Sequence, residues 1–143
     1  ASVTPPTAAE AKNVVVYFYP KDMTPGCTTE ANDFKSAAGD FAATNTLIIG
    51  VSKDSVARHI KFVEKHALNF KLLSDAELDN CERWGVWQEK KNYGRTYMGI
   101  VRSTFLIDSS GTIRNAWPKA RVKGHVAAVL EAAQQLHSAQ NAS

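Results

Sequence analysis

Short apolar runs alternate along the chain with longer segments in which apolar residues recur every three to four positions. Residues 14–19 are an unbroken apolar run rich in β-forming side chains, and residues 46–52 and 70–73 have a similar strand-like character. Runs of this length suit strands that are covered on both faces. Helical spacing is found in residues 27–43, 56–67, 76–84 and 124–136. The pattern therefore predicts strands that alternate with helices.

The last third of the chain departs from this alternation. Residues 101–108 and 112–117 lie on either side of a Ser-Ser-Gly turn and predict a hairpin. Residues 86–99 are largely polar, contain two glycines and predict a long loop of the kind that carries function or mobility. Alternating strands and helices, then a hairpin and a closing helix, predict an α/β fold with a central mixed sheet and helices on both faces. This is the thioredoxin-like arrangement.

Three of the predicted helices have an apolar face that we expect to point into the core. In the closing helix this face consists of Val126, Val129, Leu130, Ala133 and Leu136. In the first helix this face consists of Ala31, Phe34, Ala38 and Phe41. The helix at residues 56–67 can be capped by Asp54 or Ser55. Its expected inward residues are Val56, Ile60, Val63 and Ala67.

Length and composition fit one globular unit. The chain has 143 residues, of which 44% are hydrophobic and 22% charged, as in a single domain of ordinary size. We expect residues 1–143 to form one thioredoxin-like domain with frayed ends at 1–13 and 138–143. The longest apolar run is far shorter than the ~20 residues that span a bilayer, so no membrane association is expected.

Charge and cysteine content exclude several other classes of protein. The net charge of +3 is a mild excess, and the basic residues near positions 90–95 and 119–123 lack an RNA-recognition pattern and interleaved stacking aromatics. We interpret them as a solvated face and expect no nucleic-acid partner. Cys27 and Cys81 form neither a CxxC pair nor a zinc quartet, so neither a metal ion nor another cofactor is expected.

Cys27 is the strongest candidate for chemistry. It follows a strand, Pro20 and a Thr-Pro-Gly loop, which places its sulfur in the first turn of a predicted helix. Free backbone N–H groups and the helix dipole favour the thiolate there, and the thiolate is the attacking form. Thr24 is near enough for its hydroxyl to meet the sulfur or the group that it attacks, and Pro20 helps to exclude water. A lone cysteine is more often a small buried side chain, but this spacing favours a nucleophile.

The run YFYPKDMTPGCTTE at residues 17–30 resembles the active-site signature of the peroxiredoxins, P-x-x-x-T/S-x-x-C. It is most similar to the bacterioferritin comigratory protein (PrxQ) branch, which also has the TPGCTTE form. The later stretch MGIVRSTFLID at residues 98–108 resembles the second signature of that branch. Shorter matches bring the resemblance to about residues 14–136.

This resemblance implies a thiol-dependent peroxidase that reduces hydrogen peroxide and organic hydroperoxides through a sulfenic acid at Cys27. Arg102 stands in the place of the active-site arginine, where a fixed cation would hold the thiolate and, with Thr24, stabilise charge on the departing oxygen. Without the family pattern, Arg102 would be interpreted as a surface residue at a strand end. Glu30 is expected to orient polar groups near the helix start, although a first-turn acid favoured by the dipole explains it equally well.

Two features depart from the branch. The resolving cysteine stands five residues after the peroxidatic one in many members and on the following helix in others, and Asn32 and Val63 occupy those positions here. We therefore expect a one-cysteine cycle. The alternative is a two-cysteine cycle through a Cys27–Cys81 disulfide, although Cys81 is expected to be a buried packing residue. The amino-terminal end is also shorter than usual for the family, which leaves the architecture beside the first strand open.

The resemblance also implies the partners of the protein. These are a peroxide substrate and an external thiol reductant, which is thioredoxin, glutaredoxin or a small thiol. We expect a monomer in the cytoplasm, with the periplasm and organelles left open as locations. A thioredoxin-like disulfide reductase would need a CxxC pair, which the segment GCTTE lacks. A thioredoxin-like interaction module without peroxidase activity is the remaining alternative, and steady peroxide consumption with a thiol reductant separates it from the enzyme.

Overall fold

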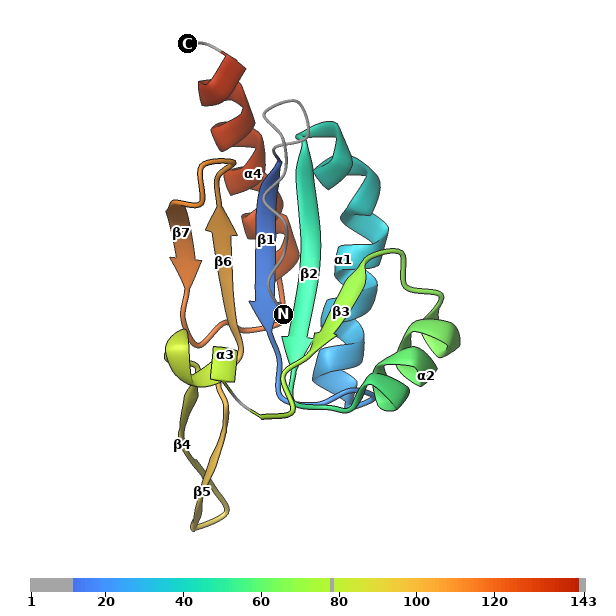
Figure 1. The fold of residues 1–143 in the computed structure, drawn as a ribbon, viewed down its shortest axis with the longest axis vertical. Coiled ribbons are helices and arrows are strands. Elements are labelled where there is room, and N and C mark those ends of the chain that lie inside the picture. The colour runs from blue at the N-terminus through green and yellow to red at the C-terminus, as the bar shows by residue number, and fades with distance from the viewer. Residues whose placement is uncertain (1–11, 78, 142–143) are drawn as a thin grey trace.

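The computed structural model describes residues 12–77 and 79–141 of the chain. At its centre is a five-stranded sheet with the order β3-β2-β1-β6-β7 (Figure 1). The strands are β1 (Asn13–Phe18), β2 (Thr46–Ser52), β3 (Lys71–Ser74), β6 (Ser103–Ile107) and β7 (Ile113–Trp117). β1 and β3 both pair in parallel with β2, whereas β6 pairs antiparallel with β1 and β7. The predicted central mixed sheet is confirmed.

Helical crossovers explain why β1, β2 and β3 run in the same direction. α1 (Pro25–Ala43) joins β1 to β2, and α2 (Val56–His66) joins β2 to β3. Parallel neighbours need such long connections, because a tight turn joins only antiparallel strands. β6 and β7 are instead joined by a short turn, in which the Asp108 carboxylate accepts hydrogen bonds from the backbone N–H groups of Ser110 and Thr112. β1 thus lies in the middle of the sheet, and its carboxyl end leads into the loop before α1.

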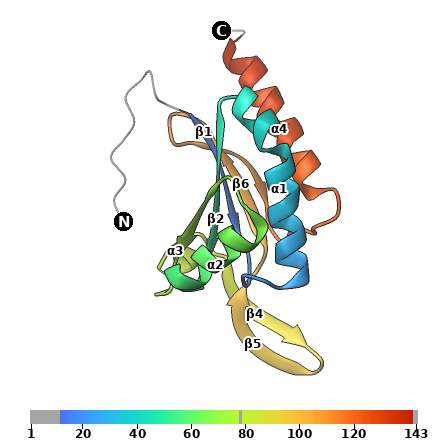
Figure 2. The same cartoon turned by 90° about the vertical axis from the view of Figure 1, so that its right-hand side faces the viewer.

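The sheet separates two apolar clusters. α1 and α4 (His125–Asn141) cover one face (Figure 2), where Tyr17 stacks on Phe34 with 4.5 Å between ring centroids. α3 (Asp79–Arg83) lies over the opposite face, where Cys81 packs in a cluster with Phe18. Tyr17 and Phe18 are neighbours in β1, so their side chains point to opposite faces. Helices therefore cover both faces of the sheet, as predicted.

Residues 86–99 do not form the loop that we expected from their polar composition. All but the first belong to an antiparallel hairpin of β4 (Trp87–Asn92) and β5 (Arg95–Ile100), which extends one residue further and projects beyond the main sheet (Figure 1). Tyr93 and Gly94 both have positive φ angles, 51° and 76°, which is the conformation of a two-residue turn that matches the twist of the strands. The prediction was wrong because β5 is buried only at its base, at Gly99 and Ile100, so no alternating pattern marks it.

The apolar residues of α2 also lie differently from the expectation. His59 and Phe62 are the buried residues of this helix, whereas Val56 and Ile60 are 63% and 52% exposed. α2 packs beside the edge strand β3, so the sheet covers only part of its surface. The helix nevertheless begins as predicted, because the Ser55 hydroxyl accepts a hydrogen bond from the backbone N–H of Arg58.

The two ends of the described chain contact each other. Asn13 is the first residue of β1, and its side-chain amide pairs reciprocally with that of Gln140 at 2.9 and 2.8 Å. α4 accordingly continues to Asn141 instead of ending at Leu136. The fraying expected at residues 1–13 and 138–143 stays a prediction, and residues 1–11 and 142–143 lie outside the described residues. Among residues 12–77 and 79–141, no helix is both long and apolar enough to cross a bilayer.

Candidate active site

Cys27 lies in the first turn of α1, after the carboxyl end of β1. Thr24 is the N-cap residue and Pro25 the first helical residue, so Cys27 is the third. A proline suits this place, because the N–H that it lacks would have no intrahelical partner. The N–H groups of Gly26 and Cys27 likewise have no carbonyl one turn earlier to bind. The sulfur is therefore placed where the partial positive charge of the helix end favours an anion.

Arg102 brings a full positive charge to the same sulfur. It lies between β5 and β6, and its Nη2 is 3.3 Å from Cys27 Sγ. The two residues are 75 positions apart, and the pairing of β6 with β1 brings them together. Gly26 leaves room for the guanidinium, since a Cβ at this position would lie only 3.2 Å from Nη2. Cys27 is 2% exposed, so the pair is largely shielded from water.

Glu30 holds the other side of the guanidinium. It lies three residues after Cys27 on α1, is fully buried, and its Oε1 accepts a hydrogen bond from Arg102 Nη1 at 2.5 Å. Burial raises the pKa of Glu30 to about 7, against the lowering effect of Arg102. Glu30 thus contacts Arg102 directly, and its orienting role stays a prediction.

Thr24 and Pro20 border the loop that leads to the sulfur. The Thr24 hydroxyl donates to the carbonyl of Lys21 at 2.9 Å. A hydroxyl that donates can still accept hydrogen bonds, so the Thr24 oxygen remains able to accept one from another donor. The donor role that the sequence suggested would require this hydroxyl to rotate away from Lys21. Pro20 is half-buried at the start of the same loop.

Cys81 does not join this site. Cys27 belongs to the cluster on the α1 and α4 face of the sheet, and Cys81 belongs to the cluster on the opposite face. Its backbone N–H donates to Asp75 Oδ2 at 2.7 Å, and burial together with Asp75 raises the pKa of the Cys81 thiol to about 12. Both cysteines are free. Cys81 is therefore a neutral, buried thiol, as expected of a packing residue.

His125 is a further buried side chain whose pKa is affected by the charge of Arg102. It begins α4, and its Nε2 lies 2.7 Å from the hydroxyl oxygen of Thr104 on β6. Burial, and to a smaller extent the charge of Arg102, lower the pKa of His125 to about 4. A neutral imidazole is therefore held at the amino end of α4.

We expect His125→Gln to change the pH dependence of stability. The unfolded chain protonates His125 below about pH 6.5, whereas the folded chain does so only near pH 4, so acid favours unfolding in this window. The free energy of unfolding of the wild type, minus that of the variant, should fall by about 3 kcal/mol between pH 7 and pH 4. Urea unfolding at a series of pH values measures this difference. Glu30 titrates in both proteins and largely cancels, and a difference that does not vary with pH would contradict the assignment.

A second cluster of polar side chains lies beside the active-site loop and was not predicted. Oxygen or nitrogen atoms of Asp22, Asp54 and His59 lie within 4.8 Å of one another, and all three residues are buried. These are residue types that bind metal ions, but their hydrogen bonds to one another and to neighbouring groups would have to be displaced first. The sequence holds no signal for the cluster, because Asp22 and His59 are 37 positions apart.

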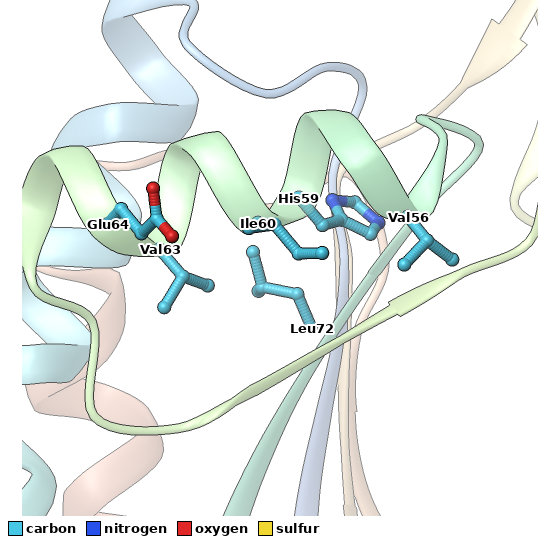
Figure 3. Close-up of a pocket in the computed structure, with 6 residues that line it drawn as sticks. All are labelled: Val56, His59, Ile60, Val63, Glu64 and Leu72. Atoms are coloured by element: carbon cyan, nitrogen blue, oxygen red, sulfur yellow. The ribbon is translucent and has the colours of Figure 1, made fainter.

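A surface pocket of about 280 Å³ adjoins this cluster (Figure 3). His59 lies between Val56 and Val63 in this view, with Leu72 of β3 opposite the helix. Val63 also lines this pocket. The pocket lining also includes Ile60, which is one of the exposed apolar residues of α2.

Comparisons with known proteins agree with this geometry. The model of the AhpC/TSA family matches residues 3–116. Peroxiredoxin Bcp of Bacillus subtilis is 55% identical over 122 residues, which are 85% of this chain and 78% of the relative. Peroxiredoxin Bcp of Xanthomonas campestris is 46% identical over 119 residues, which are 83% and 74% of the two chains.

A solved structure shows the same similarity to Bcp proteins. The bacterioferritin comigratory protein of Xanthomonas campestris superposes with a TM-score of 0.85 at 42% identity, and the match covers 89% of this chain and 81% of that one. The chain therefore belongs to the AhpC/TSA family and is, within it, a thiol-dependent peroxidase of the Bcp/PrxQ group of peroxiredoxins.

Proposed function

We propose that Cys27 is the attacking sulfur of this peroxiredoxin and that the enzyme works through a one-cysteine cycle. The observation that carries the proposal is the position of Arg102, whose guanidinium lies 3.3 Å from the sulfur and is held there by Glu30. A fixed cation beside a buried sulfur stabilises the thiolate and the negative charge that peroxide cleavage creates.

In the first step the Cys27 thiolate attacks one oxygen of a peroxide ROOH. The S–O bond forms as the O–O bond breaks, and the electron pair of that bond leaves with RO⁻, which takes up a proton to become ROH. Arg102 offsets the charge on the departing oxygen, and Thr24 accepts a hydrogen bond from the peroxide O–H. Pro20 keeps water from the sulfur. The Xanthomonas campestris relative is described as reducing alkyl peroxides, which supports organic hydroperoxides as substrates beside hydrogen peroxide.

In the second step an external thiol reduces the sulfenic acid. The thiol R′SH displaces water from Cys27–SOH and forms a mixed disulfide, and a second thiol then releases Cys27 and R′SSR′. We propose thioredoxin, glutaredoxin or a small thiol as the donor. The position of Cys81 supports an external donor, since its thiol is neutral and lies on the other face of the sheet. Asn32 and Val63 cannot supply a thiol.

The proposal extends to the assembly and location of the enzyme. Cys27, Arg102 and Glu30 all belong to one chain, which supports a monomer as the working form. Two free thiols suit a reducing compartment, which supports the cytoplasm. Sedimentation of the reduced and oxidised protein tests the first statement, and a dimer required for activity would contradict it.

Intact mass after one equivalent of hydrogen peroxide distinguishes the two cycles. We expect a gain of about 16 Da, because the sulfenic acid of Cys27 persists until a thiol arrives. A Cys27–Cys81 disulfide would instead remove about 2 Da. The matched variant Cys81→Ala should show the same gain and an unchanged turnover with excess thiol. Rapid loss of 2 Da in the wild type, with lost turnover in Cys81→Ala, would establish the two-cysteine cycle.

A further inference from the structure

Asp22 is the anchor of the loop between β1 and α1. This residue is completely buried, and all of its polar atoms have partners. Its carboxylate accepts from the Tyr19 hydroxyl at 2.5 Å and lies 2.6 Å from His59 Nδ1. Its backbone N–H donates to Asp54 Oδ2 at 2.9 Å, and its carbonyl accepts from Arg58 Nη2 at 3.3 Å. The loop before Cys27 is thereby tied to the end of β1, to the segment after β2 and to α2.

His59 is the positively charged partner of Asp22. Its Nε2 lies 3.1 Å from the carbonyl oxygen of Leu73, and its Nδ1 faces the Asp22 carboxylate, so both ring nitrogens meet acceptors. An imidazole satisfies two acceptors only when both nitrogens carry hydrogen. Burial lowers the pKa of His59, but the hydrogen bond and charge of Asp22, together with the Leu73 carbonyl and the charge of Asp54, outweigh this effect and raise the pKa above its ordinary value. The Asp22–His59 contact is therefore a buried ion pair.

The residue after Asp22 is held in an unfavourable backbone conformation. Met23 has a φ of 64°, in the left-handed region that side chains with a Cβ rarely adopt, and it packs against the main core. Such a conformation persists only where the surrounding structure enforces it. Asp22 fixes one side of Met23, and Thr24, the N-cap residue of α1, follows on the other side. The strained turn thus lies between the ion pair and the helix turn that carries Cys27.

We propose that His59 is a positioning residue for peroxide reduction: by pairing with Asp22 it enforces the turn at Met23 and so keeps Cys27 at the guanidinium of Arg102. His59 touches neither the sulfur nor the peroxide. It acts through Asp22, which is five residues from Cys27 in sequence. The inference rests on the proposed role of Cys27 as the attacking sulfur.

The proposal predicts that His59→Gln slows the peroxide step in a protein that is still folded. Removal of the cation leaves the Asp22 carboxylate buried without its partner, which favours relaxation of the turn at Met23. Displacement of a reacting group by about 1 Å can cost 10²-fold in rate, so we expect the second-order rate constant with hydrogen peroxide to fall about 10-fold or more. Stopped-flow tryptophan fluorescence, well below the melting temperature of each variant, measures this constant.

Four further variants make the test specific. His66→Gln is the matched control, since His66 lies on the same helix with its ring against Phe62, and it should keep the wild-type constant. Asp22→Asn should slow the reaction, and the double variant with His59→Gln should be no slower than the slower single variant, because both disrupt one pair. Met23→Gly should restore part of the rate in the His59→Gln background, because glycine adopts positive φ without strain.

Hydrogen exchange shows where in the chain the substitution acts. An ion pair that only stabilised the whole fold would not change exchange at the loop alone. In His59→Gln the amides of residues 22–24 and 26–28 should exchange faster than in the wild type, with little change in the centre of the sheet. If His59→Gln does not fold, Tyr19→Phe removes a single donor to the same carboxylate and should slow the reaction about threefold.

Two results would overturn the proposal. One is a wild-type rate constant in His59→Gln, or in Tyr19→Phe where that variant replaces it, whatever the change in melting temperature. The other is an equal loss in His66→Gln, which would show that the effect is not specific to the pair. Cys27→Ser separates this failure from that of the proposed function. If Cys27→Ser is inactive while His59→Gln reacts normally, only the positioning role of His59 is wrong.

Discussion

Replacement of Cys27 by serine abolishes peroxide reduction and leaves the fold intact: this is the largest effect that we expect from a single substitution. Serine has nearly the same shape and fits the first turn of α1, but its hydroxyl does not ionise in the working pH range and is a poor nucleophile towards a peroxide oxygen. Loss of a nucleophile removes the chemical step, so turnover should fall by on the order of 10⁴-fold or more.

Peroxide consumption with excess dithiothreitol measures the loss for Cys27→Ser, and circular dichroism shows that the protein is folded. Cys81→Ala provides the matched control, since it removes the other thiol from the opposite face of the sheet. We expect this control to turn over normally. Wild-type activity in Cys27→Ser would disprove the assignment of the sulfur and favour an interaction module in which Cys27 is structural.

The second large effect is expected from Arg102→Met. The variant keeps much of the volume of the side chain but removes the cation 3.3 Å from the sulfur, so the thiolate and the departing oxygen both lose their stabilising charge. Removal of one such group typically costs about 10²- to 10³-fold in rate. Glu30 should tolerate the change, because a buried carboxyl whose pKa is already raised to about 7 becomes neutral when its cation is removed.

Single-turnover measurement of the rate constant with hydrogen peroxide checks the prediction for Arg102. Arg114→Met is the matched control, since Arg114 lies on β7 of the same sheet and pairs with Asp108 in the turn that precedes this strand. Arg102→Lys should give an intermediate constant, because it retains the charge but cannot contact Cys27 and Glu30 with one planar group. An unchanged constant in Arg102→Met would exclude Arg102 from the active site.

The elements that the sequence predicted well are those that other parts of the structure cover along their length. Ala31, Phe34 and Phe41 are buried on α1 at the expected spacing, and β1 and β2 lie at the centre of the sheet. The hairpin of β4 and β5 was not predicted because the outer part of β5 is exposed. Its residues therefore do not alternate between apolar and polar as those of a half-buried strand do. Periodicity also failed to give the orientation of α2, since an edge helix leaves much of its apolar face open.

In the candidate site, sequence reasoning likewise found the residues that are close in sequence and missed contacts that depend on tertiary packing. Pro20, Thr24 and Cys27 lie within eight residues, so their proximity follows from the loop and the first turn of α1 alone. Arg102 was identified by family resemblance rather than by spacing, because its approach to the sulfur depends on strand pairing. The pairing of Asp22 with His59 depends on how α2 packs against the loop, and neither residue has a neighbouring sequence feature that would reveal the other.

The separation of Cys27 from Arg102 by 75 positions has a consequence for how activity arises during synthesis. The ribosome delivers β1, α1 and β2 first, and these can pair before β6 exists. A contact between distant segments also requires closure of a long loop, which makes it a late event in folding. The nucleophile is thus assembled before its cation, and a chain whose β6 has not yet joined β1 holds a sulfur that lacks its guanidinium partner. We therefore expect the fast reaction with peroxide to appear only after β6 has joined β1, so that peroxide reactivity reports closure of the sheet.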